Sequence, residues 1–401
     1  MKKIVVVGAS LAGVRACQNL RREGFEGDLT LIGDEKHLPY DRPPLSKTML
    51  TSDQDPLELT LVSNSDLSDL GLDLILGEQA TALNTERSEV TVGGEEIRYD
   101  GLIIATGARA RKLSKFDGIR GIHTLRTVDD ALAIRSGLQS TSSVVIVGAG
   151  FIGSEVAAAA KQRDCQVTIV EANEAPLVRG LGIKVGDAYA NLLRSNDIDL
   201  RLGVSVEEVH GDESIEGVTL TDGAFVSAEL LVVGIGAVPN TEWLTTSGLS
   251  VDDGIVCDET LNAGVRGIYA VGDVAKAPNR WLGGHIRRTE HWTTATEHAV
   301  LAAKNLLTPE SSNSYNSVPF IWSDQGEDRI QIAGDTINFD EVEILSTSAA
   351  DQAFIAGYRH GDSLAGVMAL NSMRSFVKFR RLIAGNGSWE DAVDLSQELQ
   401  S

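Results

Sequence analysis

The sequence is poor in cysteine and in basic residues. Its three cysteines, Cys17, Cys165 and Cys257, lie far apart among the 401 residues, and no Cys-x-x-Cys pair occurs. We therefore expect neither a disulfide framework nor a dithiol redox centre, and we interpret all three as small buried residues. The 35 basic and 57 acidic residues leave a net charge of −22, which disfavours nucleic acid and anionic membranes as general partners.

Long apolar runs are also lacking. No stretch of about 18 apolar residues occurs, so we expect no membrane-spanning helix. The apolar N-terminal run superficially resembles a signal peptide, but Ser10 and Arg15 interrupt it. We interpret it as a strand, a turn and a helix of a cytoplasmic chain, and we predict no metal site.

A β-α-β pattern occurs twice. Lys3–Val7 is an apolar, β-branched run typical of a buried parallel strand, and Leu11–Arg22 and Asp28–Ile32 continue it as helix and strand. Repetition of the unit is stronger evidence for paired binding domains than either copy alone. The second copy consists of Ser143–Val147 (strand), Ile152–Arg163 (helix) and Gln166–Val170 (strand).

Beyond the polar segment 311–314, the pattern changes. Arg329–Ile332, Glu341–Ile344 and Gln352–Tyr358 predict an antiparallel sheet, and Ser372–Ile383 predicts a helix. We therefore expect an α/β protein with two Rossmann-type dinucleotide-binding domains and a C-terminal α+β domain. The predicted domains are residues 1–108 with 236–311, residues 109–235, and residues 312–401.

The second glycine-rich loop has the full pattern of a dinucleotide site. Gly148, Gly150 and Gly153 form a G-x-G-x-x-G between strand and helix, and Glu171 lies about 20 residues further on. Glycines allow the tight turn, the approach of a pyrophosphate and close helix packing, while the acid binds a ribose hydroxyl. Since a carboxylate repels a 2′-phosphate, we predict NAD(H) here in preference to NADP(H). A purely structural turn is the alternative.

The first loop departs from this pattern. Gly8 and Gly13 frame it, but Ser10 replaces the middle glycine. Asp34 stands where a ribose-binding acid belongs, and the small hydroxyl of Ser10 is itself able to contact phosphate. Two dinucleotide sites suggest a bound flavin and an exchanging nicotinamide.

Two shorter segments resemble the glutathione-reductase-type architecture across residues 1 to about 310. Ala105-Thr106-Gly107 resembles the connection between its FAD and NAD domains. Gly272-Asp273 resembles its flavin-binding Gly-Asp, in which the acid meets the ribityl chain. For each segment taken alone, an ordinary turn at the end of a strand is the alternative interpretation.

Longer strings resemble one family more closely. Tyr40–Lys47 (Tyr-Asp-Arg-Pro-Pro-Leu-Ser-Lys), Glu290-His291-Trp292 and Trp322-Ser323-Asp324-Gln325 are similar to signatures of NADH-dependent ferredoxin reductases. These enzymes serve Rieske-type dioxygenases and cytochrome P450 systems, and the resemblance covers essentially the whole chain. It implies FAD and NADH as cofactors and a [2Fe–2S] ferredoxin as partner, and it leaves the oligomeric state open.

The resemblance also implies roles for individual residues. Lys47 is expected beside the isoalloxazine with Pro43 packed on it, Glu155 near the nicotinamide and paired with Lys47, and Trp292 at the flavin edge. The alternatives are a surface ion pair for Lys47 and Glu155, and a core residue for Trp292. With the two loops, the expected cofactor-binding residues are Gly8, Ser10, Ala12, Gly13, Asp34, Arg42, Pro43, Lys47, Ala80, Ala105, Thr106, Gly107, Arg126, Gly148, Gly150, Phe151, Ile152, Gly153, Glu171, Gly236, Gly272, Asp273 and Trp292.

Without a dithiol, electrons are expected to leave the flavin directly for a one-electron acceptor. An acidic ferredoxin needs a local cationic surface on this acidic chain, and two groups of basic residues supply candidates. Solvated surface charge is the alternative for each residue. The candidates are Arg287, Arg288, Arg374, Lys378, Arg380 and Arg381.

Three other functions stay open. A rubredoxin reductase shares nearly every motif. An NADH oxidase or peroxidase requires a reactive thiol, for which Cys17 is the nearest candidate. A flavin-bound interaction protein resembling apoptosis-inducing factors is the non-catalytic alternative.

Overall fold

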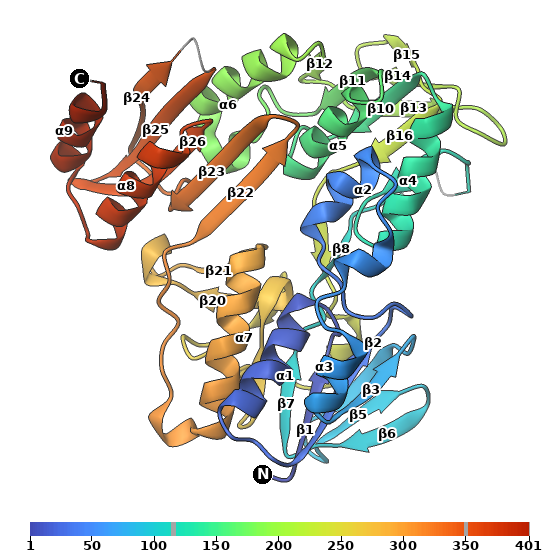
Figure 1. The fold of residues 1–401 in the computed structure, drawn as a ribbon, viewed down its shortest axis with the longest axis vertical. Coiled ribbons are helices and arrows are strands. Elements are labelled where there is room, and N and C mark those ends of the chain that lie inside the picture. The colour runs from blue at the N-terminus through green and yellow to red at the C-terminus, as the bar shows by residue number, and fades with distance from the viewer. Residues whose placement is uncertain (114–117, 349–351, 401) are drawn as a thin grey trace. The chain divides into compact units, whose positions relative to one another are not determined.

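A computed structural model describes residues 1–113, 118–348 and 352–400, which form two compact units (Figure 1). The first unit comprises Met1–Asp41, Leu57–Arg109 and Val238–Pro319. The second comprises Arg42–Pro56, Ala110–Ala237 and Phe320–Ser401. The finer division into three domains stays a prediction. No helix within the described ranges is long and apolar enough to cross a membrane.

A parallel five-stranded sheet in the order β19-β7-β1-β2-β3 forms the centre of the first unit. Its strands are almost wholly apolar because helices cover them, as a buried parallel sheet requires. Helices α1 and α7 contact each other beside this sheet (Figure 1). The bounds are β1 Lys3–Val7, β2 Asp28–Gly33, β3 Leu72–Leu76, β7 Gly101–Ile104, β19 Ile268–Ala270, α1 Leu11–Arg22, α3 Asn64–Asp69 and α7 Trp292–Leu307.

Two further sheets of the first unit have three strands each. One is antiparallel and follows β3 in the chain, and the other precedes α7. They consist of β4 Ala80–Asn84, β5 Glu89–Val92 and β6 Glu95–Arg98, and of β18 Ile255–Val256, β20 Ala275–Pro278 and β21 Ile286–Arg288.

The second unit contains a second parallel sheet, in the order β12-β11-β10-β16-β9. The predicted repeat of the β-α-β unit is thus confirmed, with β10 and β11 paired in the same way as β1 and β2. The bounds are β9 Ile122–Thr124, β10 Ser143–Val147, β11 Gln166–Glu171, β12 Asp199–Leu202, β16 Leu230–Val233, α2 Thr48–Thr51, α4 Val128–Ser140, α5 Phe151–Lys161 and α6 Val178–Ser195. A three-stranded sheet of β13 Val206–His210, β14 Gly217–Leu220 and β15 Phe225–Ser227 adjoins it in the chain.

An antiparallel sheet in the order β22-β23-β26-β25-β24 follows in the second unit, as the alternating segments predict. Helix α8 buries Phe376, Phe379 and Ile383 and leaves its other side to solvent. The bounds are β22 Phe320–Gln325, β23 Asp328–Gly334, β24 Glu341–Ser348, β25 Ala353–His360, β26 Ser363–Leu370, α8 Met373–Ala384 and α9 Trp389–Gln400.

Candidate active site

One edge of the first parallel sheet gathers most of the residues predicted to bind FAD. In open α/β sheets, ligands bind beyond the carboxyl ends of the strands. Here the segments that follow the neighbouring strands β19, β7, β1 and β2 lie at that edge. They are Gly8–Gly13 after β1, Asp34 after β2, Ala105–Gly107 after β7, and Gly272 and Asp273 after β19. The segment after β3, the fifth strand, leads to Ala80.

The first loop has the backbone of a phosphate-binding turn despite its serine. Gly8 has φ +118°, and a Cβ there would stand 2.1 Å from the carbonyl oxygen of Ala105. A Cβ on Gly13 would stand 1.8 Å from the oxygen of Gly8, so both positions require glycine. Ser10, in contrast, caps α1 with an extended backbone at φ −117°, which any residue adopts. The departure from the glycine pattern therefore costs no strain.

Other features of this edge fit a bound FAD. Gly272 has φ +70°, and a Cβ there would contact those of Ala12 and Ala295, so the starts of α1 and α7 converge on it. On α7, His298 is buried, and neither ring nitrogen has a hydrogen-bond partner within the described chain. Burial lowers the pKa of His298 to about 4. Buried polar atoms normally have hydrogen-bond partners, so the two ring nitrogens of His298 fit a site in which a polar cofactor supplies those partners.

Asn240 connects the Ala105–Gly107 segment to another part of the same unit. Its Nδ2 donates to the oxygen of Thr106 at 2.8 Å, and its backbone N–H donates to the oxygen of Gly107 at 3.0 Å. The hydroxyl of Thr106 donates to the oxygen of Asn240 at 2.9 Å. Three hydrogen bonds with Asn240 therefore hold this segment, a contact that the sequence reasoning missed.

The second parallel sheet repeats the arrangement with the residues predicted to bind NAD(H). Gly148–Gly153, predicted to bind NAD(H), follows β10, and Glu171 ends β11. Arg126, predicted to contact FAD, follows β9, and Gly236, predicted to bind a cofactor without a choice between the two, follows β16. Gly148 has φ +102°, and a Cβ on Gly153 would stand 2.1 Å from its oxygen. Gly150 caps α5, whose first residues are Phe151 and Ile152, at φ −82°, and a Cβ there would meet no atom within 4 Å. Protein packing therefore leaves open the space in front of Gly150.

Glu171 braces this loop. Its Oε2 accepts a hydrogen bond from the backbone N–H of Ala149 at 2.8 Å, and its Oε1 accepts one from that of Asn173 at 2.9 Å. The side chain is buried. A negative charge therefore stands at the end of β11, at the position that binds a ribose hydroxyl in dinucleotide folds.

Lys47 and Glu155 form the predicted ion pair, and it is not a surface pair. Lys47 Nζ lies 2.8 Å from Glu155 Oε2, and the two side chains are 21% and 4% exposed. Lys47 Nζ also donates to the oxygen of Pro43 at 3.1 Å, while Ser46 Oγ donates to the same carboxylate. The other carboxylate oxygen accepts from Ser323 Oγ at 2.6 Å. A buried carboxylate with an ammonium and two hydroxyls has the partners that a buried charge requires.

Two further predicted residues are held by specific contacts. The guanidinium of Arg42 donates to the backbone oxygen of Arg126 at 2.5 Å. Trp292 begins α7, and its Nε1 donates to Asp41 Oδ1 at 2.8 Å. This bond gives the half-buried indole a fixed orientation, which distinguishes it from a purely apolar core residue.

The predicted site residues thus fall into two sets, one in each unit. The set in the first unit comprises Gly8, Ser10, Ala12, Gly13, Asp34, Ala80, Ala105, Thr106, Gly107, Gly272, Asp273 and Trp292. The set in the second comprises Arg42, Pro43, Lys47, Arg126, Gly148, Gly150, Phe151, Ile152, Gly153, Glu155, Glu171 and Gly236.

All three thiols are buried, as expected. Burial raises the pKa of Cys17 and of Cys257 to about 12 and also raises that of Cys165. Since the thiolate is the reactive form, none of them is suited to accept electrons or to attack a substrate near neutral pH.

The basic residues predicted to bind the ferredoxin differ in their exposure to solvent. Arg374, Lys378 and Arg381 lie at the spacing of one helical face and are exposed on α8. The guanidinium of Arg380 stacks on the ring of Phe320, 4.5 Å from its centroid. Arg288 is 10% exposed and paired with Asp253 and Glu290, and Arg287 beside it is half-buried.

Some site residues had no role in the sequence reasoning. Ser46 and Ser323 lie within the strings Tyr40–Lys47 and Trp322–Gln325, so membership of those strings was the available signal. Asp41 lies in the first string, but its partner Trp292 is 251 positions away in the chain. No local pattern predicts such a pairing.

Comparisons with known proteins agree with this geometry. Residues 2–299 match the model of the pyridine nucleotide-disulphide oxidoreductase family, and residues 320–400 match a reductase C-terminal domain. Rhodocoxin reductase of Rhodococcus erythropolis is 37% identical, over 95% of this chain and 89% of its own. The ferredoxin–NAD(+) reductase component of the p-cumate 2,3-dioxygenase system of Pseudomonas putida is 34% identical, over 97% and 94%.

Among solved structures, the covalent putidaredoxin reductase–putidaredoxin complex matches with a TM-score of 0.91 and 32% identity. The match covers 96% of this chain and 93% of that one. It confirms the predicted fold class, with two Rossmann-type nucleotide-binding regions and a C-terminal α+β region. The chain belongs to the pyridine nucleotide-disulphide oxidoreductase family.

Proposed function

We propose that this chain is an FAD-dependent NADH:ferredoxin oxidoreductase that supplies a [2Fe–2S] ferredoxin of a cytochrome P450 or Rieske-type oxygenase. The observation that carries the proposal is the pair of nucleotide-binding edges in a chain whose three thiols are all buried. The two edges hold one dinucleotide each. No thiol is available to carry electrons from the flavin to an external acceptor.

FAD supplies the conversion, because it accepts a hydride from NADH and releases electrons one at a time. In the first unit, the loop Gly8–Gly13 and the start of α1 hold the pyrophosphate, and Asp34 holds the adenosine ribose. Asp273 receives the ribityl chain. The FAD part is the discontinuous segment 1–108 with 236–311, the NAD part is 109–235, and 312–401 forms the third domain.

The second unit holds NADH through Gly148–Gly153 and Glu171. Lys47 supplies a positive charge that stabilises the reduced flavin, and Glu155 holds this ammonium in place. Trp292, oriented by Asp41, stands at the flavin edge where electrons leave. The net reaction is NADH with two oxidised ferredoxins, giving NAD⁺, a proton and two reduced ferredoxins.

We place the ferredoxin on the exposed face of α8 formed by Arg374, Lys378 and Arg381, together with Arg380. Arg287 and Arg288 are further candidates, although the charge of Arg288 is already paired with two carboxylates. Relatives are named as reductases of ferredoxin systems, which favours a ferredoxin over a rubredoxin. Because NADH is available as a reductant in the cytoplasm, we place the chain in the cytoplasm.

The test is steady-state reduction of a [2Fe–2S] ferredoxin by NADH. The variant with Arg374, Lys378 and Arg381 all changed to Gln should raise the ferredoxin KM about tenfold and weaken its salt dependence. NADH–ferricyanide turnover should not change, because ferricyanide needs no protein-sized docking face.

A matched pair of single variants controls for loss of charge alone. Lys378→Gln and Arg194→Gln each remove one exposed charge from a helix of the second unit. Only Lys378→Gln should raise the ferredoxin KM. Equal KM values for the triple variant and the unmodified chain would rule out this docking face, and faster turnover with rubredoxin would favour the second candidate function.

A further inference from the structure

A row of buried hydrogen-bond donors leads from α6 through β22 to the carboxylate of Glu155. The hydroxyl of Tyr189 donates to Gln325 Oε1 at 2.5 Å, and Gln325 Nε2 donates to Ser323 Oγ at 3.2 Å. Ser323 Oγ in turn donates to Glu155 Oε1 at 2.6 Å. All four side chains are buried, with Tyr189 and Ser323 at 0% exposure. We call Tyr189, Gln325 and Ser323 the donor row.

The donor row has one direction. Each member donates toward the next, and the last donates to an anion, so each bond polarises the one that follows it. Burial raises the pKa of Tyr189, so its hydroxyl keeps its proton and remains a donor. A hydrogen bond to a charged group is stronger than one between neutral groups. The row therefore holds one oxygen of Glu155 in a fixed place.

The second oxygen of Glu155 is thereby directed at Lys47. Oε2 lies 2.8 Å from Lys47 Nζ and accepts a hydrogen bond from Ser46 Oγ. Glu155 lies on α5, whereas Ser323 is 168 positions away in the chain. Rotation of the Glu155 side chain would break contacts on both oxygens at once. The position of the Lys47 ammonium thus depends on the donor row.

Packing alone does not account for the donor row. Replacing a buried polar network with well-packed apolar side chains of similar volume is often neutral or stabilising. Ser323 and Gln325 also belong to residues 320–400, which match a different family model from the one that includes Glu155. The C-terminal segment thus supplies polar groups to a charged pair of the nucleotide-binding part.

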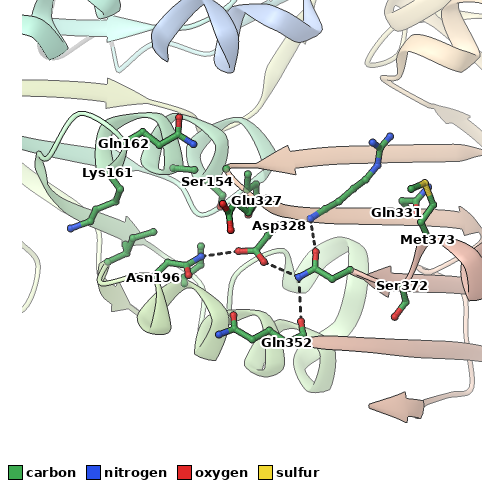
Figure 2. A pocket seen from close by; sticks show the side chains of 17 residues that line it. Ser154, Lys161, Gln162, Asn196, Glu327, Asp328, Gln331, Gln352, Ser372 and Met373 are labelled. Atoms are coloured by element: carbon green, nitrogen blue, oxygen red, sulfur yellow. Dashed lines mark hydrogen bonds between the residues drawn. The ribbon is translucent and has the colours of Figure 1, made fainter. Parts of the chain in front are cut away.

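Gln325 also lines a large cavity. The cavity has a volume of about 820 Å³, and Gln325 and Ser154 line it, whereas Ser323, Tyr189 and Glu155 do not. Figure 2 shows its wall, where Asn196 Nδ2 bonds to Asp328 Oδ2 at 2.9 Å. Of the donor row, only Gln325 reaches this cavity, so the hydrogen bond from Ser323 to Glu155 is made away from its lining.

We propose that Ser323, Gln325 and Tyr189 are positioning residues for the oxidation of NADH, which act by holding Glu155 and, through it, the Lys47 ammonium. The inference rests on the function proposed above, in which Lys47 serves the flavin. It gives the C-terminal segment a second task, in the NADH half of the reaction, besides the ferredoxin face on α8.

The experiment compares Ser323→Ala and Tyr189→Phe in the FAD-loaded protein by stopped-flow mixing with NADH. Ser323→Ala removes the donor that touches Glu155, and the rate of flavin reduction at saturating NADH should fall about tenfold. Tyr189→Phe removes only the far end of the row, and the rate should fall two- to threefold. The Kd for NADH should stay within twofold of the unmodified value in both.

Ser396→Ala is the matched control. Ser396 is also a buried serine of the C-terminal segment, but its hydroxyl donates to the backbone oxygen of Leu345. Its flavin reduction rate should be unchanged. The reduction potential of the bound flavin, which is independent of turnover, should be lower in Ser323→Ala than in Ser396→Ala, because the cation is less well placed.

A double-variant cycle decides whether the donor row acts through Lys47. In a Lys47→Met background, Ser323→Ala should cause no further loss of rate. If Ser323→Ala lowers the rate by the same factor with and without Lys47, the inference is overturned. It is also overturned if Ser323→Ala alone reduces the flavin as fast as the unmodified protein. If Ser323→Ala does not fold, the same cycle with Tyr189→Phe decides. Failure of NADH to reduce flavin in the unmodified protein would instead refute the proposed function itself.

Discussion

Gly150 and Gly153 belong to one loop but should respond in opposite ways to alanine. Gly150 has φ −82°, and a Cβ there meets no atom within 4 Å. Alanine at such a position reduces the freedom of the unfolded chain, so Gly150→Ala should stabilise the protein by about 0.4–1 kcal/mol. A Cβ on Gly153 would stand 2.1 Å from the oxygen of Gly148. Gly153→Ala should therefore displace the loop and cost about 1–3 kcal/mol.

The effect on NADH should not follow the effect on stability. In the proposed function the pyrophosphate approaches the backbone through the space before Gly150, so a methyl group there should compete with the nucleotide. We expect Gly150→Ala to raise the Kd for NADH at least about tenfold, equivalent to about 1.4 kcal/mol, while the fold is intact. Gly153→Ala should lose both stability and NADH binding.

Urea unfolding and stopped-flow flavin reduction at varied NADH concentration measure the two effects separately. Gly150→Ala is the informative variant, because its loss of affinity cannot arise from loss of fold. An unchanged NADH Kd in stable Gly150→Ala would show that the nucleotide binds elsewhere. A destabilised Gly150→Ala would show that the loop conformation is wrong.

Three further predictions follow from the same contacts. Cys17→Ser should leave NADH–ferricyanide and NADH–ferredoxin turnover unchanged, because the thiol is buried with a pKa of about 12; loss of turnover with normal FAD content would restore the thiol-dependent alternative. Glu171→Gln should lower the preference for NADH over NADPH about tenfold in kcat/KM, since the charge that repels a 2′-phosphate is gone; an unchanged ratio would remove Glu171 from the ribose site. The pKa of His298 is lowered to about 4, so an unfolded chain binds a proton that the folded chain excludes, and stability should fall as pH falls from about 6.5 toward 4, by at most about 1.4 kcal/mol per pH unit. Between pH 7 and pH 5, the urea midpoint of His298→Gln should therefore fall less than that of the unmodified protein. An equal fall in both proteins would show that protonation of His298 does not cause the loss of stability.

The sequence predicts the parts of the fold that depend on local order. The apolar strands β1 and β10, the turns after them and the helices α1 and α5 follow from periodicity and glycine spacing, and their predicted bounds agree within a few residues. Asp34 after β2 and Glu171 at the end of β11 follow from the same spacing. These features lie close together in the chain, so one window of sequence contains the whole pattern.

The contacts that join distant segments are beyond such reasoning. Ser323 donates to Glu155 across 168 positions, and Trp292 donates to Asp41 across 251. Segment 42–56 joins the second unit although the residues on both sides of it in the chain belong to the first. Packing of the whole chain determines these pairings, whereas propensity and periodicity describe only neighbours in sequence. Ser10 is the opposite case, where the backbone shows why a departure from the pattern is tolerated.

Anaerobic titration of the purified protein with NADH tests the central claim most directly. A flavin that passes electrons straight to an external acceptor takes up one equivalent of NADH per FAD, and two equivalents of oxidised [2Fe–2S] ferredoxin then restore its absorbance. We predict this stoichiometry, because the three buried thiols offer no second redox centre. Protein purified without flavin, or uptake of two equivalents of NADH per FAD, would contradict the account.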